Sequence, residues 1–315
     1  MLEQNAAVPA ANPTDDEPQL ERTLSLPLLV FYGLGVTVGA GIFALVGEIL
    51  GIAGDHAALA FLLAGVIAGF TGVSYMALVA QFPRAGGEAV YVNRGLGRQA
   101  GRFAGLGVVV TGIISSAVVA QAFSGYVATL VSVPKWLTAA ALVLLLTAVA
   151  WWGVRESVIV ASIVTVLEVG TLLAVALFGL PEIELDVVAR GFDLSGAGTT
   201  SAVLTGAGIA FFAFIGFEDI ANMAEETKDP RTTAPRARAT LLVGAAIIVL
   251  LMFPLVTLAR VTSIVTLSVF TLVNLALVRL TRLMPELGHM KWVVNGVVGA
   301  IVSAGLGIWQ IVELF

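Results

Sequence analysis

Two glycines interrupt the first long apolar stretch of the chain, residues 27–51, at Gly39-Ala40-Gly41. Glycine costs about 1 kcal/mol relative to alanine inside a helix, so a helix is expected to unwind here. The half-helix that follows would then present free backbone N–H groups and its positive dipole end, which together favour an anion such as a carboxylate. The alternative is close helix packing through small residues. The candidate ligand-binding residues at this break are Thr37, Gly39, Ala40, Gly41 and Ile42.

A second apolar stretch, residues 200–224, carries a similar interruption at Phe214-Ile215-Gly216-Phe217-Glu218. Backbone carbonyls released near Phe214, Ile215 and Gly216 would accept hydrogen bonds from a ligand ammonium group. One interrupted span in each half of a chain is typical of secondary transporters, whose solute site lies near the bilayer midplane between such spans. The pair of breaks therefore predicts a split solute site.

Several carboxylates and one arginine are candidates for ion coupling or gating. Glu168 stands in the middle of an apolar stretch with no basic neighbour in sequence. Apolar surroundings favour the protonated form of a carboxylate, so Glu168 is suited to cycle a proton; the alternative is a protonated glutamate that bonds a neighbouring helix. Glu218 follows the second break and either takes part in coupling or shapes the bend. Arg84 and Glu88 are candidates for ion pairs at a gate, each worth under about 1 kcal/mol at a surface.

The composition identifies a membrane protein. Hydrophobic residues make up 58% of the chain and charged residues 12%, with a mean hydropathy of +1.00, against roughly 25% charged residues in soluble domains. The chain has no cysteine and only two histidines, His56 and His289, so we expect no disulfide, metal site or cofactor. No phosphate-binding P-loop, catalytic triad or basic aromatic surface is visible, so we expect neither an ATP-driven pump, nor an enzyme, nor a nucleic-acid partner.

About nine apolar stretches are long enough to cross a bilayer: residues 28–50, 57–81, 103–132, 136–153, 157–180, 200–224, 239–258, 261–280 and 292–313. Cytoplasmic loops collect Lys and Arg. With residues 1–26 as a disordered cytoplasmic tail, all but three of the 16 Lys and Arg residues fall on the inner side; the exceptions are Lys135, Arg190 and Arg260. We expect a multi-pass protein of the plasma (cell inner) membrane, with its N-terminus in the cytoplasm.

The stretch Gly35-Val-Thr-Val-Gly39-Ala-Gly41-Ile-Phe43 resembles the first-helix motif of amino acid permeases of the amino acid–polyamine–organocation superfamily. Gln81-Phe-Pro-Arg-Ala-Gly-Gly-Glu88, Gly153-Val-Arg-Glu-Ser157 and Phe211-Phe-Ala-Phe-Ile-Gly-Phe-Glu218 resemble later motifs of that family, in the same order, and the cationic amino acid transporter-like branch is the most similar. The resemblance implies an all-α bundle of two inverted five-helix repeats and transport of amino acids or amines by alternating access. It also implies an aromatic ring over the substrate at Phe214.

The sequence departs from the family pattern after its sixth span. Residues 27–180 resemble the first repeat, residues 200–282 an incomplete second repeat, and residues 291–315 an additional helix. Counterparts of the family's seventh and eighth helices are missing, with a junction near residues 236–239. In some proton-coupled permeases a lysine stands where this chain has Glu168. Because two helices are missing, the alternative function is a truncated, non-transporting permease that at most binds solute. Which amino acid is carried, whether protons or sodium ions couple to it, and the oligomeric state stay open.

Overall fold

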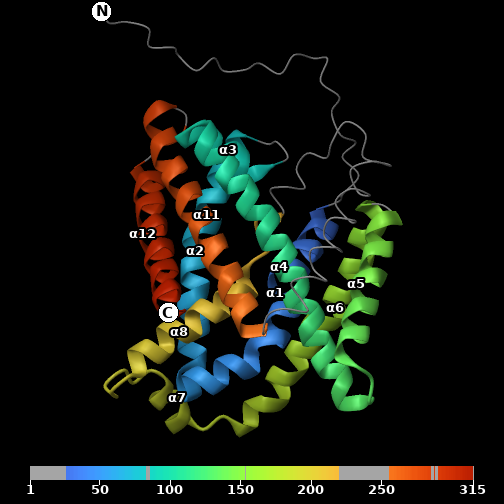
Figure 1. Cartoon of the computed structure of the whole chain (residues 1–315). Coiled ribbons are helices and arrows are strands. Elements are labelled where there is room, and N and C mark those ends of the chain that lie inside the picture. The colour runs from blue at the N-terminus through green and yellow to red at the C-terminus, as the bar shows by residue number, and fades with distance from the viewer. Residues whose placement is uncertain are drawn as a thin grey trace, which may run out of the picture.

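The computed structural model describes residues 26–82, 86–152, 154–219, 255–284, 287 and 290–314, and within these ranges every regular element is a helix (Figure 1). The α-helices are α1 (Leu26–Ala53), α2 (Ala57–Gln81), α3 (Gly87–Leu96), α4 (Arg98–Leu130), α5 (Lys135–Trp152), α6 (Val154–Gly179), α7 (Leu185–Gly191), α8 (Thr199–Ala210), α11 (Leu255–Leu283) and α12 (Met290–Val312). Short 3-10 turns η1 (Gly54–His56), η2 (Leu180–Glu182) and η3 (Phe211–Phe214) follow α1, α6 and α8.

Most of the predicted spans correspond to these helices. Among the described residues, six apolar stretches are long enough to cross a membrane, and one of them, Gly33–Gln81, comprises most of α1 together with η1 and α2. A shorter apolar helix, Thr199–Phe214, coincides with the first part of the predicted span 200–224. Three predicted features lie outside the described residues: all of the tail at residues 1–26 except its last residue, the junction near residues 236–239, and most of the span 239–258.

The expected break between two spans at Ala259-Arg260 is wrong. Helix α11 runs without interruption from Leu255 to Leu283 and includes both residues. Alanine and arginine are good helix formers, so only the charge of Arg260 suggested a loop there. The structure places that charge near the start of α11 and beside the end of α12, where the Nη1 atom of Arg260 donates a hydrogen bond to the backbone oxygen of Glu313 over 3.2 Å.

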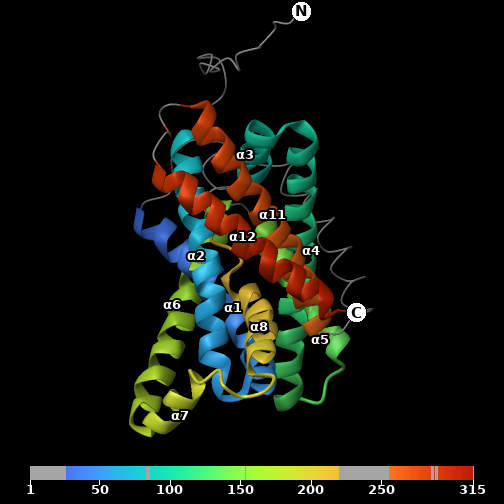
Figure 2. The same ribbon diagram turned by 90° about the vertical axis from the view of Figure 1, so that its left-hand side faces the viewer.

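The helices form a bundle with distinct ends. In Figure 1, α3 lies at the upper end and α7 at the lower end. At the lower end, α7 is tied to the turn between α1 and α2: Arg190 pairs with Asp55 over 3.2 Å, and the Nδ1 atom of His56 lies 3.0 Å from the backbone oxygen of Gly191. Helix α6 packs on α1, while α12 packs obliquely across α11 and α2 (Figure 2). Residues far apart in sequence therefore meet around α1.

Buried polar side chains fasten α12 and α11 to α2. The side-chain amide of Asn274, fully buried, donates to the hydroxyl of Thr71 over 2.9 Å and accepts a hydrogen bond from Ser74. The amide of Asn295 donates to the same Ser74 hydroxyl over 2.9 Å. Hydrogen bonds of this kind hold membrane helices together, so Asn274 joins α11 to α2.

Candidate functional site

The predicted interruption of the first span is present. Within α1, Gly39 has φ -50° and ψ -142°, which is outside the helical range and separates two helical halves. The half-helix that begins after it contains Ala40, Gly41 and Ile42 in its first turn. Backbone N–H groups in a first turn have no carbonyl four residues before them, so the break supplies the donors that the sequence predicts. The hydroxyl of Thr37 donates to the backbone oxygen of Gly33 over 2.7 Å within the preceding half.

The sixth predicted span is interrupted as well. Helix α8 ends at Ala210, the turn η3 follows, and Ile215 is extended with φ -69° and ψ 132°. Gly216 has φ +129°, a conformation that residues with a side chain rarely adopt. The backbone N–H of Gly216 donates to the Oε2 atom of Glu218 over 2.8 Å, and Glu218 is 7% exposed. The Glu218 side chain therefore satisfies a backbone group that the break releases.

The structure brings the two breaks into direct contact. A Cβ atom placed on Gly41 would lie 2.9 Å from the Cα atom of Ala213 in η3. A Cβ atom on Gly216 would lie 2.7 Å from the backbone oxygen of Val36 in α1 and would also overlap its Cγ1 atom. Only residues without side chains allow the two backbones to approach this closely. The glycines at both breaks therefore serve a common junction.

An aromatic ring beside the first break belongs to Phe212, whereas the family resemblance predicts the ring of Phe214 over the ligand. The Cδ1 atom of Phe212 is 3.5 Å from the position of a Cβ on Gly41, while the ring of Phe214 lies 3.1 Å from that of a Cβ on Gly65 in α2. In a 3-10 turn, residues three apart point in the same direction, so Phe214 faces the same way as Phe211 and away from Phe212. The role expected of Phe214 stays a prediction.

Glu168 reaches the first break from α6. Its Oε2 atom lies 3.6 Å from the position of a Cβ on Gly39. One turn earlier, Thr165 of α6 lies so close to Gly35 that a Cβ there would overlap its hydroxyl. Glu168 is partly buried, and its carboxylate has no hydrogen-bond or ion-pair partner within the described ranges. Helix α6 therefore presents an unpaired carboxylate to the junction.

A cluster of aromatic rings lies between the second break and α3. The ring of Tyr75 in α2 makes edge-to-face contacts with Phe217, with Tyr91 in α3 and with Phe270 in α11, at centroid distances of 5.6, 6.0 and 5.7 Å. The Tyr75 hydroxyl donates to the Oε1 atom of Glu88 over 3.0 Å. Burial, together with the Glu88 carboxylate, raises the pKa of the Tyr91 phenol. The cluster fills the bundle on the α3 side of the junction.

Of the two candidates for ion pairs at a gate, the structure describes Glu88 but not Arg84. Glu88 is 2% exposed rather than at the surface, because α3 packs against both α4 and α11. Its carboxylate accepts the Tyr75 hydrogen bond described above. Arg84 lies outside the described residues, so its ion pair stays a prediction.

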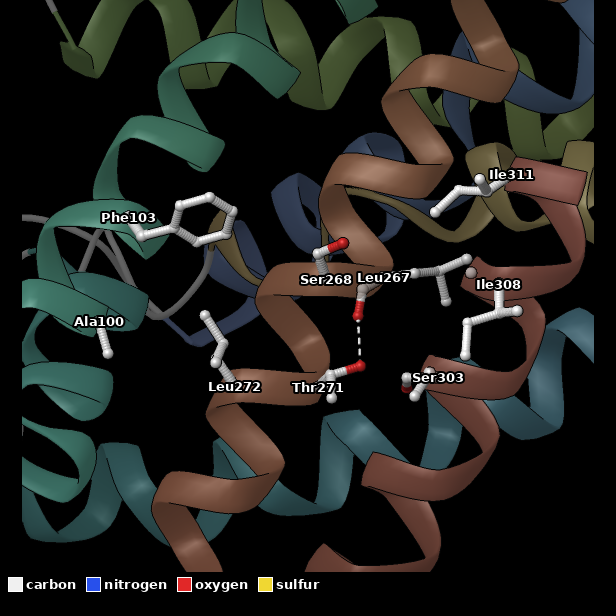
Figure 3. Close-up of a pocket in the computed structure, with 11 residues that line it drawn as sticks. Ala100, Phe103, Leu267, Ser268, Thr271, Leu272, Ser303, Ile308 and Ile311 are labelled. Carbon is white, nitrogen blue, oxygen red and sulfur yellow. Dashed lines mark hydrogen bonds between the residues drawn. The ribbon is translucent and has the colours of Figure 1, made fainter. Parts of the chain in front are cut away.

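A cavity of about 380 Å³ lies elsewhere, between α4, α11 and α12 (Figure 3). Its walls are mostly apolar, with Phe103, Leu272 and Ile308 among the lining residues. The hydroxyls of Ser268 and Thr271 donate to backbone oxygens of their own helix over 2.8 and 2.7 Å. This cavity contains none of the predicted site residues, so it is separate from the junction of the breaks.

Comparison with known proteins agrees with this architecture. The sequence profile described as amino acid permease matches residues 29–307, nearly the whole chain. The chain belongs to the amino acid permease family. It is therefore a multi-pass integral membrane protein.

Three relatives illustrate the range of this permease's similarities. An uncharacterized transporter of Mycobacterium tuberculosis is 36% identical over 228 residues, covering 72% of this chain and 50% of the relative. Cationic amino acid transporter 2, vacuolar, of Arabidopsis thaliana is 31% identical, covering 72% and 39%. A low-affinity putrescine importer of Escherichia coli is 29% identical, covering 75% and 54%. The chain thus spans about half the length of the curated relatives it matches.

Sequence reasoning did not identify four residues of the permease's central region. Phe212, Tyr75, Phe217 and Phe270 each look like ordinary apolar residues of a span. Nothing in their local sequence separates them from lipid-facing aromatic residues. Only Phe217 stood within a predicted break, and that position was the one available signal.

Proposed function

We propose that this permease binds an amino acid or a related amine between the two breaks and carries it across the membrane by alternating access. The observation that carries the proposal is the direct contact of the breaks at Gly39 and Gly216. N–H groups of the half-helix after Gly39 would hold a substrate carboxylate. Carbonyls released near Phe214, Ile215 and Gly216 would accept hydrogen bonds from a substrate ammonium group.

The names of two relatives support this substrate class: one is a cationic amino acid transporter and the other is a putrescine importer. The test is uptake of radiolabelled ornithine and putrescine into proteoliposomes that contain the purified chain. Accumulation above that of protein-free liposomes supports the proposal. Binding without any uptake would instead support the second candidate, a permease that has lost transport. The coverage of about half of each relative favours that candidate, as do the helices that we propose to be missing near residues 236–239.

Proton coupling through Glu168 is part of the proposal. An unpaired carboxylate at the first break can bind a proton in one conformation of the transport cycle and release it in another. Uptake by the wild-type chain should therefore depend on an imposed pH gradient, and Glu168→Gln should abolish that dependence. If the variant responds to the gradient as the wild type does, Glu168 does not carry the coupling.

We also propose that α3 lies on the cytoplasmic side of the plasma membrane and α7 on the outer side. Arginines gather near α3, at Arg94, Arg98 and Arg102, as the positive-inside rule requires. Because the chain has no cysteine, single cysteines introduced as Arg98→Cys and Asp193→Cys would report the orientation directly. An impermeant thiol reagent applied to intact cells should label only the variant at Asp193.

A further inference from the structure

Among the described residues, the helices and turn that pack closely on α6 (α1, α5 and η2) place few charged groups near Glu168. On α1, the described side chains include one ionisable group, Glu48, which is exposed and nine residues beyond Gly39, or about 13 Å along a helix. On α5, the one charged residue is Lys135, at the start of the helix, and η2 contributes Glu182 beyond the end of α6. The other charged residues of α6 itself stand at its first turn: Arg155 and Glu156.

Any ligand held at the break after Gly39 therefore meets the carboxylate of Glu168, which has no partner among the described residues. The second break adds the carboxylate of Glu218, whose Oε2 atom accepts the backbone N–H of Gly216 over 2.8 Å. A ligand carboxylate bound by the first-turn N–H groups would come close to Glu168. Two carboxylates that share one site cannot both stay ionised without a large energetic cost. A ligand ammonium group in the same place would instead be attracted by the ionised form.

We infer that the protonation state of Glu168 selects between two substrate classes: carboxylate-bearing amino acids bind when Glu168 is protonated, and amines without a carboxylate bind when it is ionised. The inference rests on the proposed function, because it assumes that the substrate occupies the junction of the breaks. It adds that the two classes carry different numbers of protons. An amino acid would enter together with one proton on Glu168, and an amine would enter in place of that proton.

Ornithine and putrescine are suitable probes because they differ by a single carboxylate. Their dissociation constants for the purified full-length chain in lipid nanodiscs would be measured between pH 5 and pH 8. As the pH falls through the range in which Glu168 titrates, ornithine should bind more tightly and putrescine more weakly. A single linked proton sets the limit of each change at about tenfold per pH unit.

Glu168→Gln should remove both pH dependences. The neutral amide resembles the protonated acid, so the variant should bind ornithine with the affinity that the wild type has at low pH. Its affinity for putrescine should fall by about tenfold or more relative to the wild type at pH 8, equivalent to the loss of one ion pair of about 1.4 kcal/mol. The matched control is Glu48→Gln, which changes an exposed carboxylate of α1 and should leave both profiles unchanged.

The possible failures are distinguishable. If both ligands bind and their affinities change in the same direction with pH, the inference is refuted while the proposed function stands. The same holds if the opposite slopes persist in Glu168→Gln. If neither ligand binds to a wild-type chain with an intact thermal transition, the proposed function fails, and this inference fails with it.

Discussion

Replacement of Gly216 by alanine tests whether the junction between the two breaks is a structural requirement. The residue has φ +129°, and a side chain held in such a conformation costs about 1–3 kcal/mol. The new Cβ would also lie 2.7 Å from the backbone oxygen of Val36. Overpacking against atoms that cannot rotate away costs about 1–3 kcal/mol more. The expected destabilisation is therefore about 2–6 kcal/mol.

The measurement is the thermal transition of the purified protein in detergent, followed by tryptophan fluorescence, together with uptake of ornithine. Soluble domains of 150–250 residues lose about 2–4 °C per kcal/mol, so Gly216→Ala should lower the Tm by at least about 4 °C and reduce uptake. The matched control is Gly69→Ala in α2, where a new Cβ meets nothing within 4 Å. That variant should be neutral or gain up to about 1 kcal/mol from helix propensity. Equal Tm and uptake in the two variants would refute the reasoning.

Three further substitutions test polar contacts elsewhere in the bundle. Tyr75→Phe removes the hydroxyl that donates to Glu88 over 3.0 Å and should cost about 1–3 kcal/mol; an unchanged Tm would mean that the bond does not form in the purified protein. Asn274→Leu removes the buried amide between α11 and α2 and with it two interhelical hydrogen bonds. The loss should lower the free energy of unfolding by about 1–3 kcal/mol and give a lower Tm than that of the wild type. Arg190→Ala breaks the exposed pair with Asp55 and should shift stability by no more than about 1 kcal/mol; a larger loss of Tm would show that α7 depends on this pair.

The sequence predicted the two breaks because each is a local property of the chain. A glycine inside an apolar span weakens the helix wherever that span packs, so Gly39 and Gly216 were visible without tertiary information. The sequence wrongly predicted a break between two spans at Arg260, which interrupts an apolar run. A long charged side chain near the end of a membrane helix can extend its charged group to the polar boundary. The helix backbone then continues past that residue without a break.

The place of each aromatic side chain could not be predicted in the same way. Phe211, Phe212 and Phe214 are adjacent and chemically equivalent in the sequence. Whether they follow a 3-10 or an α-helical path decides which ring faces α1, and that path depends on the packing of η3 against α1 and α2. In the structure the ring of Phe212 lies beside the first break and that of Phe214 lies against Gly65 of α2.

What the sequence determined by itself is the class of protein and the two weak points of its helices. Apolar span length and glycine placement are properties of short segments, and they hold in any arrangement of the bundle. Only the tertiary structure decided that the weak points touch and that Glu168 faces Gly39. These contacts join residues more than a hundred positions apart, and they arise because α6 and η3 both pack on α1.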